Sequence, residues 1–265
     1  MRSPSPVAAL PRRDRVVIAG CILLACAIAW AYLVHAHHQT SSRAAADMPM
    51  MDMGMRMDAP WGAADLVFTF TMWAVMMVGM MSPSAAPVVL LFAATHARRA
   101  DGSARAAVPM FGLGYIAVWV AFSACATLAQ WALHQAALLS PTMAAASPRL
   151  AGALLIAAGV YQLTPLKHAC LTHCQTPLGF LVTHWRDGTA GAFQMGLRHG
   201  NYCLGCCWAL MGVLFAVGVM NLAWVAALTA FILLEKMGEG GQRVARVGGV
   251  LLIVLGVLYF TRQTR

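Results

Sequence analysis

Charged residues are scarce in this chain. They make up 10% of its 265 residues, and only nine of them are Asp or Glu. So few carboxylates leave little basis for catalysis by a carboxylate pair. The motifs of phosphate-binding loops, zinc proteases, serine hydrolases and dinucleotide-binding folds are also absent. These absences argue against the enzyme classes that such motifs define, and we expect a binding protein rather than an enzyme.

Apolar residues are abundant instead. They form 60% of the chain, and the mean hydropathy is +0.70. Apolar runs long enough to cross a bilayer recur along the sequence. Lipid cannot satisfy backbone hydrogen bonds, so spanning segments must be helices or a closed barrel. Because the runs are continuous rather than alternating, we expect an all-α fold, a polytopic helical membrane bundle in contact with the lipid bilayer.

Seven spans are expected from the positions of these runs. They are residues 16–34, 64–81, 109–130, 150–166, a span from 191, 222–234 and 247–260. The chain would then divide into a cytoplasmic tail with a first helix that could act as a signal anchor (1–34), a loop rich in Met and His (35–60), and a six-helix domain (61–265). The segment KHACLTHCQTP after the fourth span is expected to be a loop.

The net charge of +9 comes from basic residues scattered among the loops. No basic stripe or aromatic platform accompanies them, so we expect no nucleic-acid partner. Loops rich in Lys and Arg alternate with loops that are poor in them. By the positive-inside rule, this alternation predicts a cytoplasmic N-terminus and a C-terminus on the opposite side.

The segment HGNYCLGCCW places soft donors within an apolar run. These donors are His199, Cys203, Cys206 and Cys207. Their spacing puts them on one stripe of a helix. Imidazole and thiolate together suit Cu(I) or zinc. Cys170 and Cys174 of the segment CLTHC are four residues apart as well, and the two clusters flank a short connection, so we expect them to meet.

Two alternatives compete with a metal site at these cysteines. Free cysteine can simply be a small buried residue, which is how we interpret Cys21, Cys26 and Cys125. A structural disulfide between Cys170 and Cys174 is disfavoured, because the expected topology places both near the reducing cytoplasm. The concentration of donors therefore favours metal or redox chemistry.

Arg198 is an ionisable residue just inside the fifth span, and Glu235 ends the sixth span on the same membrane side. Charged groups are costly in lipid and usually face the bundle interior. An intramembrane Arg198–Glu235 ion pair is therefore one interpretation. The other is that the Arg198 side chain extends to the membrane surface.

Methionine is concentrated before and within the second span. The loop methionines are Met48, Met50, Met51, Met53, Met55 and Met57, and the histidines that precede them are His35, His37 and His38. Thioethers select Cu(I), so this loop is either a secondary copper-collecting site or a disordered spacer. Within the span, Met72, Met76 and Met80 recur every fourth residue. They would pack the core or form a thioether path inward.

Six motifs carry a resemblance to a known family. They are WAVMMVGMMSPSAAP, GYIAVW, GVYQLTPLKHACLTHCQTP, HGNYCLGCCWALM, GVMNLAWVAAL and LLEK, which lie between about residues 60 and 240. The chain resembles the bacterial family of predicted metal-binding integral membrane proteins, domain of unknown function 2182. The resemblance implies a multi-helix membrane protein that handles metal, often proposed to be copper. The family's characteristic donors correspond to Cys170, Cys174, His199, Cys203, Cys206 and Cys207. Gln175 departs from the pattern, where an arginine is expected.

Taken with the resemblance, the residues predict a multi-pass protein of the bacterial inner membrane with a periplasmic C-terminus. We expect it to bind copper, or alternatively zinc, for uptake, transfer or delivery to a copper enzyme or metallochaperone. One rival is a membrane dithiol–disulfide oxidoreductase that uses the Cys203–Cys206 pair and Cys207. Another is a structural subunit of a membrane assembly, in which the thiols have no role.

Overall fold

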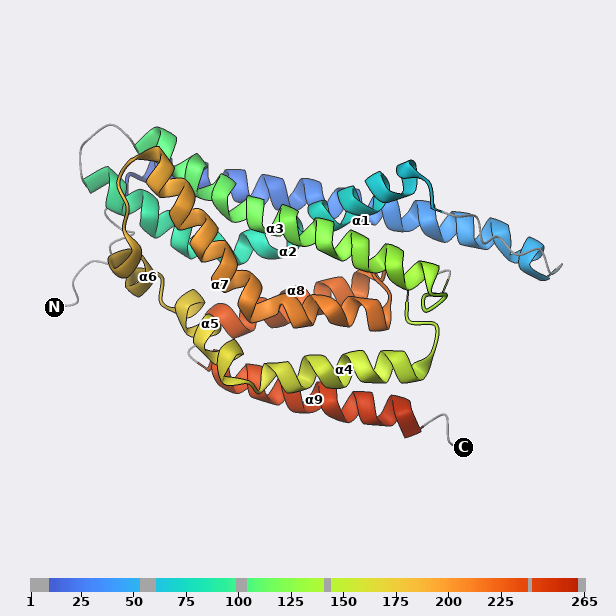
Figure 1. Cartoon of the computed structure of the whole chain (residues 1–265). Coiled ribbons are helices and arrows are strands. Elements are labelled where there is room, and N and C mark those ends of the chain that lie inside the picture. The colour runs from blue at the N-terminus through green and yellow to red at the C-terminus, as the bar shows by residue number, and fades with distance from the viewer. Residues whose placement is uncertain (1–9, 53–60, 99–103, 141–143, 238–239, 262–265) are drawn as a thin grey trace.

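A computed structural model of the chain describes residues 10–52, 61–98, 104–140, 144–237 and 240–261. Within these ranges the protein forms nine α-helices and no β-strand, which confirms the all-α class (Figure 1). The helices are α1 (Arg12–Asp52), α2 (Ala63–Arg98), α3 (Ala104–Gln135), α4 (Pro148–Gln162), α5 (Pro165–Gln175), α6 (Pro177–His184), α7 (Gly188–Val217), α8 (Leu222–Met237) and α9 (Gly241–Thr261).

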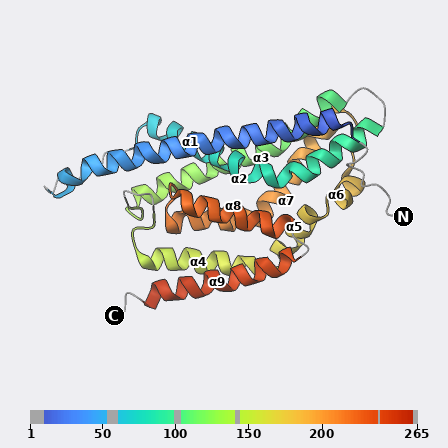
Figure 2. The same ribbon diagram turned by 180° about the vertical axis from the view of Figure 1, so that it is seen from behind.

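Five of the described helices are long and apolar enough to cross a membrane: α1, α2, α3, α7 and α9. Helices α4 and α5 meet at a bend of 63° and together would form a sixth span. The remaining expected span, 222–234, corresponds to α8, which has only 16 residues. Figures 1 and 2 show the long helices lying side by side, with the two termini at opposite ends of the bundle.

The expected loop at residues 35–60 is helical over much of its length. Helix α1 does not end at residue 34 but continues to Asp52. The sequence there includes Ala44, Ala45 and Ala46 among several methionines, and these residue types favour a helix. Polarity alone therefore misplaced the end of this helix by about five turns.

The segment KHACLTHCQTP was expected to be a loop, and this prediction is wrong. Its residues form helix α5 and the start of α6. Pro165 stands at the first position of α5, where its missing N–H is harmless. The hydroxyl oxygen of Thr164 caps the helix by accepting a hydrogen bond from the backbone N–H of Lys167 at 3.3 Å. A proline with a threonine cap thus ends α4 and starts a new helix in a different direction.

Helix α7 lies at the centre of the bundle, where it packs against α3, α4 and α5. Its close approach to α3 depends on glycine. A Cβ atom at Gly196 would collide with the carbonyl group of Phe111, and one at Gly200 would lie 2.9 Å from a methyl carbon of Val118. The absence of side chains at these two positions lets the backbones approach closely. This packing buries one face of α7 along most of its length.

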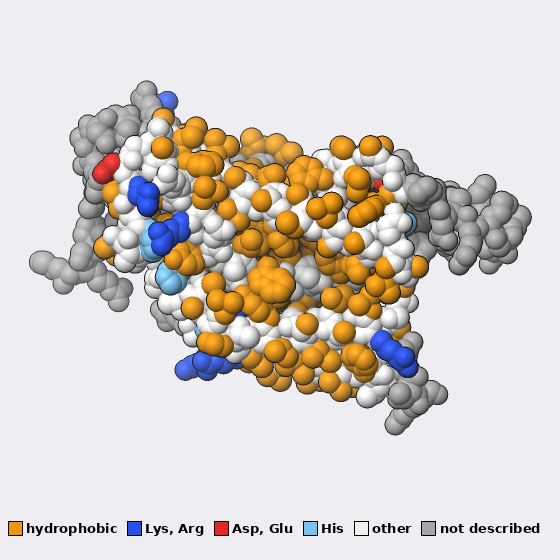
Figure 3. Space-filling model, in the orientation of Figure 1, with side chains coloured by type: hydrophobic (Ala, Val, Ile, Leu, Met, Phe, Trp, Pro, Cys, Tyr) orange, Lys and Arg blue, Asp and Glu red, His pale blue; other side chains and the backbone are white. Residues whose placement is uncertain are grey.

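The outer surface is apolar over the middle of the molecule. Figure 3 shows hydrophobic side chains covering most of one face, with Lys and Arg near the ends. The peripheral helices α1 and α9 are the most exposed of the candidate spans, since only 17% and 22% of their most apolar windows are buried. A broad apolar belt between charged ends is the surface that a lipid bilayer would cover.

Candidate metal centre

The three cysteines of α7 are buried together on its inner face. Cys203, Cys206 and Cys207 each expose 1% of their surface or less. The Sγ atoms of Cys206 and Cys207 are 3.7 Å apart. Both thiols donate to the backbone oxygen of Cys203, over 3.1 Å from Cys206 and 2.7 Å from Cys207. The helical spacing of the motif therefore produces a compact thiol group.

Helix α5 brings a second pair of cysteines to this group. The Sγ atom of Cys174 lies 3.9 Å from that of Cys206. Cys170, one turn earlier on α5, faces Gly205 so closely that a Cβ atom there would lie 2.8 Å from the Cys170 sulfur. The structure thus brings together the two segments that the sequence analysis expected to meet. It does so through a helix where a loop was expected.

A buried lysine contacts the thiols and was missed by the sequence analysis. The Nζ atom of Lys236 donates to the Sγ atom of Cys203 over 2.8 Å and to the hydroxyl oxygen of Ser84 over 3.2 Å. Lys236 lies in the last turn of α8, whereas the sequence analysis counted it among the loop charges that orient the protein in the membrane. Its position directly after Glu235, at the end of an apolar run, was the available signal.

Tyr115 and Ser84 complete the polar side of the centre. The Tyr115 hydroxyl lies 3.1 Å from the Cys203 sulfur and donates to the backbone oxygen of Met81 at 3.0 Å. The Ser84 hydroxyl donates to the same oxygen at 2.8 Å. Tyr115 belongs to the GYIAVW motif and Ser84 to SPSAAP, so both motifs border the thiol group.

The predicted ion pair between Arg198 and Glu235 is not formed. Glu235 is fully buried and instead pairs with Lys167, whose Nζ atom is 2.7 Å from its Oε2 atom. Gln162 donates to the other carboxylate oxygen, also over 2.7 Å. Arg198 lies on the exposed side of α7. Since neighbouring residues of a helix point about 100° apart, Arg198 cannot share the buried face that His199 occupies.

His199 lies beside the thiols in an aromatic pocket. Its ring centroid is 5.8 Å from that of Tyr115 and 5.2 Å from that of Phe180. The side chain is 2% exposed, and its Nδ1 atom has no hydrogen-bond partner. A buried ring nitrogen without a partner is costly, and a metal ligand bond is one way to satisfy it.

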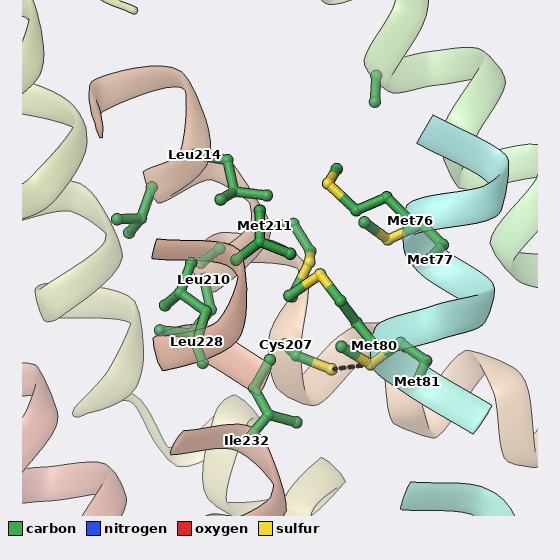
Figure 4. Close-up of a cluster of buried hydrophobic side chains, with 14 of the residues drawn as sticks. Met76, Met77, Met80, Met81, Cys207, Leu210, Met211, Leu214, Leu228 and Ile232 are labelled. Atoms are coloured by element: carbon green, nitrogen blue, oxygen red, sulfur yellow. Dashed lines mark hydrogen bonds between the residues drawn. The ribbon is translucent and has the colours of Figure 1, made fainter. Parts of the chain in front are cut away.

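Buried methionines of α2 pack against the cysteine-bearing face of α7 (Figure 4). Met72, Met76, Met77, Met80 and Met81 are all fully buried. Figure 4 shows the last four of them on the turns of α2 that face Cys207 and Met211 of α7. The Sδ atom of Met81 lies 4.0 Å from the Cys207 sulfur. Thioethers and thiols are therefore in direct contact inside the bundle.

The N-terminal donors lie apart from this centre. The Nδ1 atom of His37 is 2.9 Å from the backbone oxygen of Met220, and the ring of His35 bonds the Gln39 side chain. The ring centroids of His37 and His38 are 6.0 Å apart. Met48, Met50 and Met51 belong to α1, but their side chains lie outside the described part of the structure, as do Met53, Met55 and Met57 altogether.

The thiols are spaced as metal ligands would be, but they do not form a complete coordination shell. Among the described residues, no group of three or more His, Cys, Asp or Glu side chains is arranged to hold a metal ion. The Cys206–Cys207 and Cys174–Cys206 sulfur separations, 3.7 and 3.9 Å, nevertheless match sulfurs that share one ion. Two thiolates at ~2.3 Å from a tetrahedral metal lie ~3.8 Å apart. A soft ion could therefore bind between neighbouring thiols with little movement.

A family comparison names copper. Residues 70–259 match PpoB2, a family described as copper chaperones. The matched region runs from α2 to α9 and contains every cysteine of the thiol group, but not the Met/His segment. No curated protein and no solved structure matches the chain. The matched family differs in name from the one that the motifs resemble. Its description is the more specific of the two, because it names copper. The chain belongs to the PpoB2 family of copper chaperones.

Proposed function

We propose that this protein is an integral membrane copper chaperone that holds Cu(I) between helices α5 and α7. The contact between Cys174 and Cys206 carries the proposal, because it joins a half-buried thiol of α5 to the buried thiols of α7. Thiolates select Cu(I) over harder ions. Membership of a copper chaperone family favours copper over the zinc alternative.

The proposed ligands are the cysteines of this group. Cys206 is central, since its sulfur contacts those of both Cys174 and Cys207. Cys203, Cys170 and His199 border the same space and would exchange with these ligands as copper enters and leaves. The unpartnered Nδ1 atom of His199 supports its inclusion.

Copper would reach the thiols along the methionines of α2. Thioethers bind Cu(I) without losing a proton, so they can serve in oxidising or acidic surroundings. Met81 is the last step of this route, because its sulfur contacts Cys207. The Met/His segment of residues 35–60 would collect the ion where the route begins.

The proposed setting is the bacterial inner membrane, with the N-terminus in the cytoplasm and the C-terminus in the periplasm. The Met/His segment, which includes the last part of α1, would then lie on the periplasmic side. The partner that receives copper would be a copper enzyme during its assembly, or a metallochaperone. The apolar belt of the surface supports contact with lipid.

Anaerobic reconstitution with Cu(I) tests the proposal. Copper should bind the wild-type protein stoichiometrically and be lost in Cys203→Ser/Cys206→Ser. The matched control is Cys21→Ser/Cys125→Ser, which removes two exposed free thiols and should retain copper. Elemental analysis of the same samples distinguishes copper from zinc.

Other outcomes would favour the rival functions. A metal-free protein with two fewer titratable thiols than its eight cysteines would indicate a dithiol–disulfide oxidoreductase. A metal-free protein with all eight thiols free, together with an unchanged phenotype of the cysteine variant, would indicate a structural subunit.

A further inference from the structure

The last turn of α8 contains two buried residues of opposite charge. Glu235 and Lys236 follow each other in the chain, and their exposed fractions are 0% and 7%. Because neighbouring helical positions point in different directions, the two side chains reach different partners. They do not neutralise each other by contact, since the one ion pair that Glu235 makes among the described residues is with Lys167.

The charge of Glu235 is already balanced. Lys167 of α5 is completely buried and lies 2.7 Å from one carboxylate oxygen, while Gln162 of α4 donates to the other. Both oxygens of the carboxylate are therefore engaged. Burying a charge is tolerable only when it is paired and hydrogen-bonded in this way.

The charge of Lys236 has no carboxylate to balance it within the described structure. Its Nζ atom contacts a hydroxyl oxygen, on Ser84, and a sulfur, on Cys203. Glu235 is the only carboxylate among the buried residues that the structure describes, and it already forms an ion pair with Lys167. The anion that faces this ammonium group must therefore come from the thiol group itself.

We infer that Lys236 is the counter-cation of the loaded copper site and restricts that site to one Cu(I) held by two thiolates. The inference rests on the proposed function. Each thiol that binds the metal gives up its proton. One Cu(I) with two thiolates carries one net negative charge, which the ammonium group of Lys236 balances at contact distance. Three thiolates on one Cu(I) would leave one negative charge buried without a partner.

Three variants test the inference. Lys236→Met removes the charge but keeps much of the volume, and it should weaken Cu(I) binding by about 10²-fold, the scale expected when one partner of a buried ion pair is removed. Lys236→Arg keeps the charge and should restore most of the affinity. Ser84→Ala removes the neutral partner of Lys236 and should change the affinity by less than about tenfold.

Competition with the chelator bicinchoninate measures these affinities on full-length protein in detergent. X-ray absorption at the copper edge should count two sulfur ligands in the wild type. The thermal unfolding of each variant, followed by circular dichroism, separates lost folding from lost affinity. If Lys236→Met fails to fold, Lys236→Arg and the sulfur count still decide the question.

The outcomes separate this inference from the proposed function. Wild-type protein that binds no Cu(I) would refute the function itself. Wild-type protein that binds Cu(I) as tightly as Lys236→Met would refute only the role of Lys236, and so would a folded Lys236→Arg that binds no better than Lys236→Met. A count of three sulfur ligands on one ion would also contradict the inferred limit of two thiolates.

Discussion

The two neighbours at the end of α8 lie in regions of very different character. Glu235 enters a region between α4, α5 and α8, where Lys167 pairs with its carboxylate, Gln162 donates to it and Gln175 donates to its backbone oxygen. Lys236 enters the thiol group between α2, α7 and α8, where its partners are a sulfur and a hydroxyl oxygen. The charge of Glu235 is balanced within the described structure, whereas that of Lys236 meets no carboxylate there. Under the proposed function, the first region holds helices together and the second receives an ion.

Removing one member of the matched pair should have the largest effect on stability. Lys167→Met leaves the Glu235 carboxylate buried without its cation, and the free energy of unfolding should fall by about 3–5 kcal/mol. Unfolding in detergent, followed by circular dichroism, measures the loss. The double variant Lys167→Met/Glu235→Leu removes both charges and should recover much of it. If Lys167→Met is as stable as the wild-type protein, the Lys167–Glu235 pair does not stabilise the fold.

A smaller effect is expected where α7 passes Cys170. A Cβ atom at Gly205 would lie 2.8 Å from the Cys170 sulfur, so Gly205→Ala should cost about 1–3 kcal/mol by overpacking. Gly212→Ala, on the same helix with nothing within 4 Å of its Cβ position, should be neutral or stabilise the protein by up to about 1 kcal/mol. Unfolding measurements on the two variants check the difference. Equal stabilities would mean that α5 can move away from α7 at no cost.

The smallest effect on stability is expected at Met81. Met81→Leu preserves the volume of the side chain and should change stability by less than about 1.5 kcal/mol. It removes the thioether next to Cys207, so Cu(I) loading followed by stopped flow should slow several-fold. Met211→Leu, which alters a buried methionine of α7, is the control and should load normally. If both variants load at the wild-type rate, the methionines of α2 serve packing alone.

The sequence was informative about the thiols and misleading about the charges. The one-turn spacing of Cys203, Cys206 and Cys207 predicts a shared face because it depends only on helical geometry. The contact between Cys174 and Cys206 was also accessible, since a short connection joins their segments. The partner of Glu235 could not be predicted in this way, because Lys167 and Arg198 were both expected on its side of the membrane and the sequence does not say which of them faces it. Only the rotation of α7 about its own axis, set by glycine packing against α3, excludes Arg198.

The ends of the helices were also difficult to predict from the sequence. The polarity of residues 35–60 and of KHACLTHCQTP predicted loops, whereas alanine-rich sequence and a Thr–Pro cap favour helix locally. The burial of Lys236 against Cys203 was equally hidden. A lysine that ends an apolar run has the same sequence pattern whether it faces water or a buried sulfur.

The bend between α4 and α5 has a mechanical consequence. Because Leu163 and Thr164 separate the two helices, α5 leaves the direction of α4 and carries Cys170 and Cys174 towards α7. The same short helix carries Lys167, which pairs with Glu235 of α8. Any movement of α5 that parts Cys174 from Cys206 would also break this buried ion pair, so the release of a bound ion would be coupled to the pair.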